Sequence, residues 1–244
     1  KDLSSFVKSY SVLFKIFKET MKFHRIFAII YRHLCLLPKS IDRLTDLFFW
    51  PLLEVLTLGL TTIWLSKNSA QHTEILASVL SGVLLWRVVW QSNYEIGVNI
   101  LEETWNKNLT NLLATPLTKI EWLTANLIVG IIKLILVLGV LSLGSHFLYG
   151  INIFKIIIHV PHYLFSLALF GWSLGFLASG IVLRFGMKAQ AFTWTLASFF
   201  GPFCATFYAV SILPDWAQKI SYALPATYMF ESLRAIVLNN APIP

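Results

Sequence analysis

The residues whose types and spacing could carry out chemistry gather in one short stretch near the middle of the chain. Two adjacent carboxylates, Glu102 and Glu103, come first, and Trp105, Asn106 and Asn108 follow them. Paired carboxylates can act as general acid and general base, but neighbours on a helix point about 100° apart and do not converge on one bond. The spacing therefore counts against a catalytic pair and favours a polar helix surface.

A rigid helical connection is predicted for the same stretch. Pro116 should end a short helix, because proline lacks an N–H and disfavours helical geometry in the residue before it. Thr118, three residues before Glu121, predicts a capping box at the start of the next helix. No glycine occurs between Ile100 and Leu127, so the connection is not expected to be a flexible loop.

Two further charged residues, Glu54 and Arg87, interrupt long apolar segments. In a membrane, an ionisable side chain at a helix centre costs about 2.5–3.5 kcal/mol, so each needs a partner or a functional reason. At a rise of ~1.5 Å per residue, both lie at similar depths. We expect an ion pair that locks two helices; the alternative is a polar path for a charged substrate group. Lys133 is expected to extend its ammonium group to the outer surface and is given no role.

The elements that position these residues are indicated by the composition. The 244 residues are 57% hydrophobic and 13% charged, whereas a soluble domain carries about 25% charged residues. So little charge cannot cover the surface of a water-soluble monomer. This excludes soluble enzymes and nucleic-acid binders, despite the net charge of +7. The sequence predicts an all-α, polytopic membrane helical bundle.

Five segments meet the length of a membrane span, which is ~20 mostly apolar residues. They are about 47–66, 75–98, 122–149, 156–183 and 189–213. A further apolar stretch, about 214–238, is interrupted by proline and by charge and predicts an external or re-entrant helical region. Its marker residues are Pro214, Trp216, Pro225, Glu231 and Arg234. Residues 47–244 are thus expected to form one transmembrane domain.

Residues 1–46 differ from this domain, because apolar residues recur there at helical spacing between basic ones. We expect a cytoplasmic amphipathic helix in the headgroup region with its basic face outward. A helix packed on a soluble partner is the alternative, and both can hold together. Most of the 19 Lys and Arg residues fall before the first span or in the loops on its side of the membrane. The positive-inside rule then predicts a cytoplasmic N-terminus and a multi-pass protein of the cytoplasmic (inner) membrane.

From Glu102 onward the order E-E-x-W-x-x-N-L-x-N-L-L-x-x-P-L-x-x-x-E-W resembles the intracellular loop of ABC-2 type permeases. Residues 48–54, FFWPLLE, resemble the start of that family's first span. ILPDW at 212–216, with LPATY at 224–228, resembles its external region, which closes with the E-x-x-R of Glu231 and Arg234. The resemblance covers about residues 43–234.

This resemblance implies an exporter subunit with six spans that forms a homodimer or heterodimer of permeases. The sixth span has no recognisable counterpart here. It also implies a separate ABC ATPase subunit that binds ATP and Mg²⁺. This chain has no G-x-x-x-x-G-K-[ST] loop, and we expect it to bind no cofactor or metal and to be no enzyme. The resemblance further makes the polar stretch a coupling helix that contacts the ATPase. The contact residues would be Glu102, Glu103, Trp105, Asn106 and Asn108.

Two other functions stay open on the sequence. A membrane-embedded transferase acting on lipid-linked substrates would need clustered acidic or histidine side chains at the interface. A secondary transporter would typically show inverted repeats and broken helices. Co-purification of an ATPase would separate the exporter from both. The sequence does not choose among drugs, lipids and glycans as the substrate.

Overall fold

The computed structural model of the chain describes residues 22–66, 72–151 and 161–239. Within these ranges four helical segments are long and apolar enough to cross a membrane. They are Ile41–Leu65, Ile75–Trp105, Lys119–Tyr149 and Pro161–Ala189. No residue of the described ranges lies in a β-strand. The prediction of an all-α, polytopic helical bundle is therefore confirmed.

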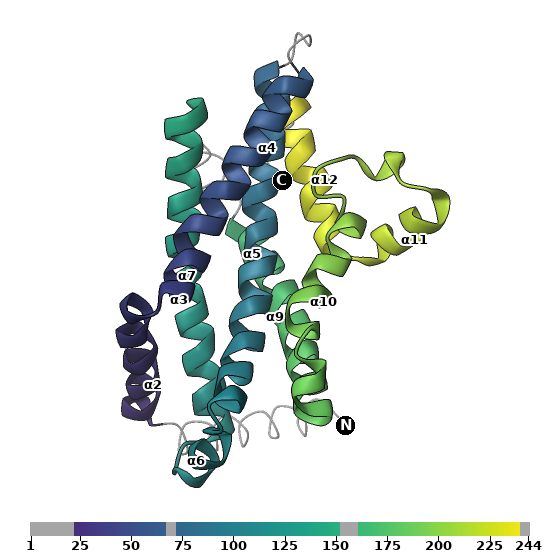
Figure 1. The fold of residues 1–244 in the computed structure, drawn as a ribbon. Coiled ribbons are helices and arrows are strands. Elements are labelled where there is room, and N and C mark those ends of the chain that lie inside the picture. The colour runs from purple at the N-terminus through teal and green to yellow at the C-terminus, as the bar shows by residue number, and fades with distance from the viewer. Residues whose placement is uncertain (1–21, 67–71, 152–160, 240–244) are drawn as a thin grey trace, which may run out of the picture.

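The long helices stand side by side around α5 (Figure 1). They are α4 (Trp50–Ser66), α5 (His72–Trp105), α7 (Lys119–Tyr149) and α9 (Pro161–Phe185). The seam between α5 and α9 is especially close, because a Cβ atom on Gly171 would lie only 2.5 Å from the backbone oxygen of Val89. Small residues at such a seam let two helix backbones approach each other. α5 is thus the central element that positions the polar residues described below.

The first four predicted spans correspond to long helices, with shifted ends. The first is preceded by α3 (Ile41–Leu44) and by a π-helical turn (Thr45–Phe49), so its apolar segment begins earlier than predicted. The second continues beyond residue 98 to the end of α5. The third begins at Lys119, directly after Thr118, which is the N-cap residue of the predicted capping box. Residues 156–160, at the predicted start of the fourth, lie outside the described residues.

The predicted fifth span, about 189–213, is wrong as a continuous helix. Its described residues form a 3₁₀ turn (Gly186–Ala189), the nine-residue helix α10 (Phe192–Phe200) and two further 3₁₀ turns (Pro202–Cys204 and Val210–Ile212). Pro202 supplies no backbone N–H to continue α10, and Ala205 adopts a left-handed conformation with φ +52°. Apolar composition alone does not record these two interruptions of the helix.

The predicted re-entrant region consists of α11 (Asp215–Ala223) and α12 (Pro225–Asn239). Pro214 and Pro225 stand at the starts of these two helices, where the missing N–H has no helical partner to lose. α11 projects to the side of the bundle. α12 packs on α5 and α9 and rises toward the end of the bundle at which α4 ends and α5 begins (Figure 1).

The N-terminal helix α2 (Phe23–Leu36) runs alongside the lower half of α7 (Figure 1). The prediction that its basic face turns outward is wrong: Arg25 and Arg32 reach carboxylates of the bundle, whereas Phe27 and Tyr31 are exposed. Glu103 at the end of α5 and Glu121 at the start of α7 are buried carboxylates, and α2 supplies a positive partner for each. Residues 1–21 of the predicted 1–46 segment lie outside the described residues.

Candidate functional site

Three carboxylates gather at the corner where α5 ends and α7 begins, beside the short helix α6 (Leu109–Ala114). Each pairs with an arginine from the N-terminal segment. The pairs are Glu102 with Arg43, Glu103 with Arg32 at 2.9 Å, and Glu121 with Arg25 at 3.5 Å. We call these six residues, together with α6, the α5–α7 corner. The ion pairs tie α2 and α3 to the connection between two membrane-spanning helices.

Glu103 and Glu121 are buried inside this corner and have further hydrogen-bond partners. Glu103 Oε2 accepts a hydrogen bond from Asn108 Nδ2 at 2.6 Å. Glu121 accepts hydrogen bonds from the backbone N–H groups of Lys22 at 2.7 Å and Thr118 at 2.8 Å. These carboxylates therefore hold backbone and side chains of the same chain in place.

Trp105, the last residue of α5, and Asn106, which follows it, are exposed residues beside the corner. The Trp105 indole stacks on that of Trp194 with ring centroids 6.3 Å apart, and its Nε1–H donates to Gln190 at 3.3 Å. This joins the end of α5 to the start of α10. Asn106 and the following Lys107 are exposed, with Lys107 in a left-handed conformation at φ +52°. Of the five predicted contact residues, Asn106 and one side of Trp105 are open to a partner, and the two glutamates and Asn108 have partners within the chain.

His33 lies buried on the inner side of α2, one residue beyond Arg32. Burial, together with the positive charges of Lys133, Arg43 and Arg32, lowers the pKa of its imidazole to about 3. The ring is therefore neutral where α2 is docked. The sequence analysis did not single out His33, although it lies seven residues after the buried Ile26 and hence on the same helix face.

The predicted pair of Glu54 and Arg87 is formed, with 3.0 Å between Glu54 Oε1 and Arg87 Nη1. Arg87 Nη2 also donates to the backbone oxygen of Asp46 at 2.9 Å. That oxygen belongs to the π-helical turn before α4. The hydroxyl of Tyr94, seven residues after Arg87 on α5, donates to the Asp46 carboxylate. Two residues of α5 thus hold the π-helical turn that precedes α4.

Lys133 does not extend to the outer surface, and the prediction that it has no role is wrong. Its ammonium group is buried against Glu95 of α5, at 2.7 Å from Oε1 and 2.9 Å from Oε2. Asn99 Nδ2 donates to the same carboxylate at 3.1 Å and to Asn126 Oδ1 at 2.9 Å. Further hydrogen bonds offset part of the cost of burying an ion pair, and Asn99 supplies one to this carboxylate.

The residues of α5 that make these contacts form a polar row, which runs along the helix from the middle of the bundle to the α5–α7 corner. Its members follow one another within one or two helical turns: Arg87, Tyr94, Glu95, Asn99 and Glu102. A cavity of about 20 Å³ lies beside the last four of these residues and is also lined by Arg43 and Gln91. That volume has room for about one water molecule. The row links the corner to the middle of the membrane-spanning segments.

In the region after α10, Glu231 and Arg234 of α12 pair with each other at 2.9 Å. Arg234 donates to the backbone oxygen of Ala205 at 2.7 Å, and Glu231 accepts from the N–H of Val210 at 2.8 Å. The two residues thereby fix the irregular segment between α10 and α11. Trp216 of α11 is exposed and packs edge-on against Phe203, with ring centroids 6.0 Å apart.

Comparison with known families gives a match to the ABC-2 type transporter model over residues 26–238. The match covers α2 through α12, so it includes the α5–α7 corner, the polar row and the region after α10. A comparison with curated proteins gave no match.

Proposed function

The chain belongs to the ABC-2 type transporter family, and we propose that it is the permease subunit of an exporter driven by a separate ATPase. It is a multi-pass membrane protein of that family's permease type. Members of the family generally pair with an ATPase subunit, and the permease itself is not the catalytic component. The proposal concerns the direction of transport, the coupling site and the assembly as a dimer of permeases.

The observation that carries the coupling proposal is the construction of the α5–α7 corner. Nucleotide-driven movement of an ATPase has to become a tilt of membrane-spanning helices, which requires a short element joined rigidly to them. α6 is such an element: three residues separate it from α5, and the capping box of Thr118 and Glu121 follows closely. Arginines of α2 and α3 stiffen the same corner through their ion pairs.

Within this corner we assign two roles. Asn106, Lys107 and the open side of Trp105 contact the ATPase, because they are exposed at its outer end. Glu102, Glu103 and Asn108 hold the corner in shape, so that a displacement of α6 also moves α2 and α3.

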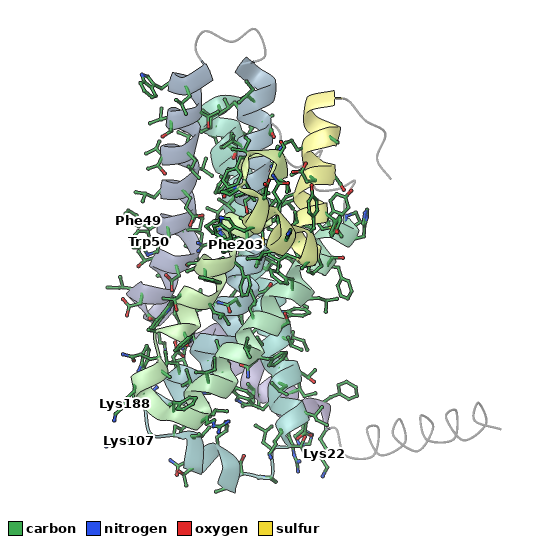
Figure 2. All side chains as sticks on the ribbon, turned by 90° about the vertical axis from the view of Figure 1, so that its right-hand side faces the viewer. Lys22, Phe49, Trp50, Lys107, Lys188 and Phe203 are labelled. Atoms are coloured by element: carbon green, nitrogen blue, oxygen red, sulfur yellow. The ribbon has the colours of Figure 1, made fainter. Side chains whose placement is uncertain are left out.

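The distribution of lysines supports a cytoplasmic position for this end. Lys22, Lys107 and Lys188 all lie at the end of the bundle that carries α6 (Figure 2). Lysine and arginine are retained on the cytoplasmic side of bacterial and organellar membranes. The region of Pro214, Trp216, Pro225, Glu231 and Arg234 would then lie toward the outer side, as part of the exit.

The proposal is tested by purifying the chain with its ATPase and measuring ATP hydrolysis and subunit association. A double variant, N106A with K107E, should lose most of the association while the permease still inserts into the membrane. K219E is the matched control, because Lys219 is an exposed lysine on α11, away from the corner. Equal association of the wild type, the double variant and K219E would overturn the coupling assignment.

A further inference from the structure

α4 carries an unusual face for a helix that crosses a membrane. Trp50, Glu54, Thr57 and Thr61 follow one another at spacings of four, three and four residues, which places them on one side of the helix. Trp50, Thr57 and Thr61 are exposed, and the Glu54 side chain is 39% exposed. We call these four residues the α4 polar face. Figure 2 shows Trp50 at mid-height, at about the same level as Phe203 of the region after α10.

The two threonine hydroxyls and the Glu54 carboxylate on this face can accept hydrogen bonds but have no hydrogen left to donate, and Trp50 adds an indole N–H donor beside them. The Thr57 hydroxyl donates to the backbone oxygen of Leu53 at 2.7 Å, and the Thr61 hydroxyl donates to that of Thr57 at 2.7 Å. Glu54 gives Oε1 to Arg87, and no described residue donates to its Oε2. The face therefore presents a carboxylate oxygen and two hydroxyl oxygens, with an indole ring beside them.

The position of Glu54 shows that this oxygen requires polar surroundings. It lies near the middle of the candidate span Ile41–Leu65, far from either end. An ionised oxygen exposed there to hydrocarbon is strongly disfavoured, so ionisable residues in spans face cavities or other polar groups. Arg87 does not cover it, because the guanidinium lies behind the carboxylate with a side chain only 5% exposed. A polar group that approaches Glu54 from outside the chain would supply these surroundings.

We propose that the α4 polar face is a substrate-contacting surface and that Glu54 selects amphiphilic substrates with a positively charged group. This inference rests on the proposed function, since it takes transport as the reason for a polar surface at this depth. A cation is complementary to a face of acceptor oxygens, and the exposed indole of Trp50 can add a cation–π contact. An anionic headgroup would meet the carboxylate oxygen and the acceptor hydroxyls and would be repelled.

The inference is tested by binding two probes of the same shape and opposite charge, tetraphenylphosphonium and tetraphenylborate. The purified chain is held in lipid nanodiscs, and empty nanodiscs supply the background. The wild type should bind the phosphonium in excess of this background and should show no such excess for the borate. E54Q should weaken phosphonium binding about tenfold, which corresponds to ~1.4 kcal/mol.

Two further variants separate recognition from damage to the fold. T57V removes an acceptor from the α4 polar face without touching a charge, and it should weaken phosphonium binding by a smaller factor. D42N is the control, because Asp42 is also an exposed carboxylate but lies on α3, away from the α4 polar face. It should leave phosphonium binding unchanged.

Equal excess binding of the two probes, or no excess binding of the phosphonium, would overturn the inference. Phosphonium binding that is the same in the wild type, E54Q and T57V would also overturn it. This includes the case in which E54Q leaves phosphonium binding unaltered and instead weakens association between two copies of the chain. No ATPase takes part in this measurement. Charge-selective binding that depends on Glu54, without association with an ATPase, would therefore uphold the surface and contradict the proposed coupling.

Discussion

Glu95 and Lys133 are almost fully buried, and the carboxylate gives both oxygens to the ammonium group, whereas Glu54 gives Arg87 one oxygen and leaves the other at the surface. Both pairs join α5 to a neighbouring membrane-spanning helix. The exposed fractions are 1% for Glu95 and 8% for Lys133, against 39% for Glu54 and 5% for Arg87. We call Glu95–Lys133 the closed pair and Glu54–Arg87 the open pair. A closed pair can only hold two helices together. An open pair can hold them and also interact with another molecule.

Disrupting the closed pair should have the largest effect on stability. K133M leaves the Glu95 carboxylate buried without its positive partner, and removing one partner of a buried pair costs about 3–5 kcal/mol. The free energy of unfolding in mixed micelles should fall by that amount. The double variant E95L with K133M should recover most of the loss, because replacing both charges by apolar groups is often close to neutral. A K133M protein as stable as the wild type would show that the pair contributes no stability.

Lowering the pH should weaken the docking of α2 at the α5–α7 corner, because His33 becomes protonated. Its pKa is lowered from 6.5 to about 3 in the folded chain, so the unfolded state binds the proton more readily. The stability from the neutral ring is complete above pH 6.5 and is lost as the pH falls from 6.5 toward 3. From pH 7 to pH 5 the loss should be about 2 kcal/mol. Hydrogen exchange of α2 measures it, and H33Q should remove most of this pH dependence.

Altering the open pair should change stability less. In E54Q the amide oxygen can still accept from Arg87, and Asp46 continues to hold the guanidinium through its backbone oxygen. We expect a loss of about 1 kcal/mol, the size of a typical net hydrogen-bond contribution. The same unfolding measurement checks it. A loss as large as that of K133M would mean that the two pairs do not differ in the way described.

The pair of Arg32 and Glu103 at the corner should contribute least. The side chain of Arg32 is 40% exposed, so solvent and salt screen its attraction to Glu103. R32Q should lower the free energy of unfolding by about 0.5 kcal/mol, as is typical of exposed pairs. The difference from the wild type should shrink further in high salt. A loss of stability that does not depend on salt would show that the Arg32–Glu103 pair behaves like the closed pair instead.

The sequence predicted the helical class, the first four spans and the partners Glu54 and Arg87, because these follow from local composition and from depth along a helix. The capping box of Thr118 and Glu121 was predicted for the same reason. Lys133 was misjudged since its depth says nothing about Glu95, which is 38 residues away along the chain and faces it only after α5 and α7 pack. The inward turn of α2 likewise depends on distant carboxylates.

The fifth span shows a different limit of sequence analysis. Gly201 and Pro202 are a local signal of a helix end inside a segment that is otherwise apolar. The irregular segment that follows is held by Glu231 and Arg234 from α12, about 25 residues later. Hydropathy measures how well a segment dissolves in lipid and does not record where its backbone hydrogen bonds go.

The most direct test of ATP-driven export is transport by the reconstituted complex. The chain and its ATPase are placed in proteoliposomes with the ATPase sites outside, and accumulation of labelled tetraphenylphosphonium is followed after ATP is added. We predict accumulation that requires ATP, both subunits and an intact Asn106–Lys107 turn. Accumulation by the chain alone, driven by an ion gradient and indifferent to the ATPase, would contradict this function and indicate a secondary transporter.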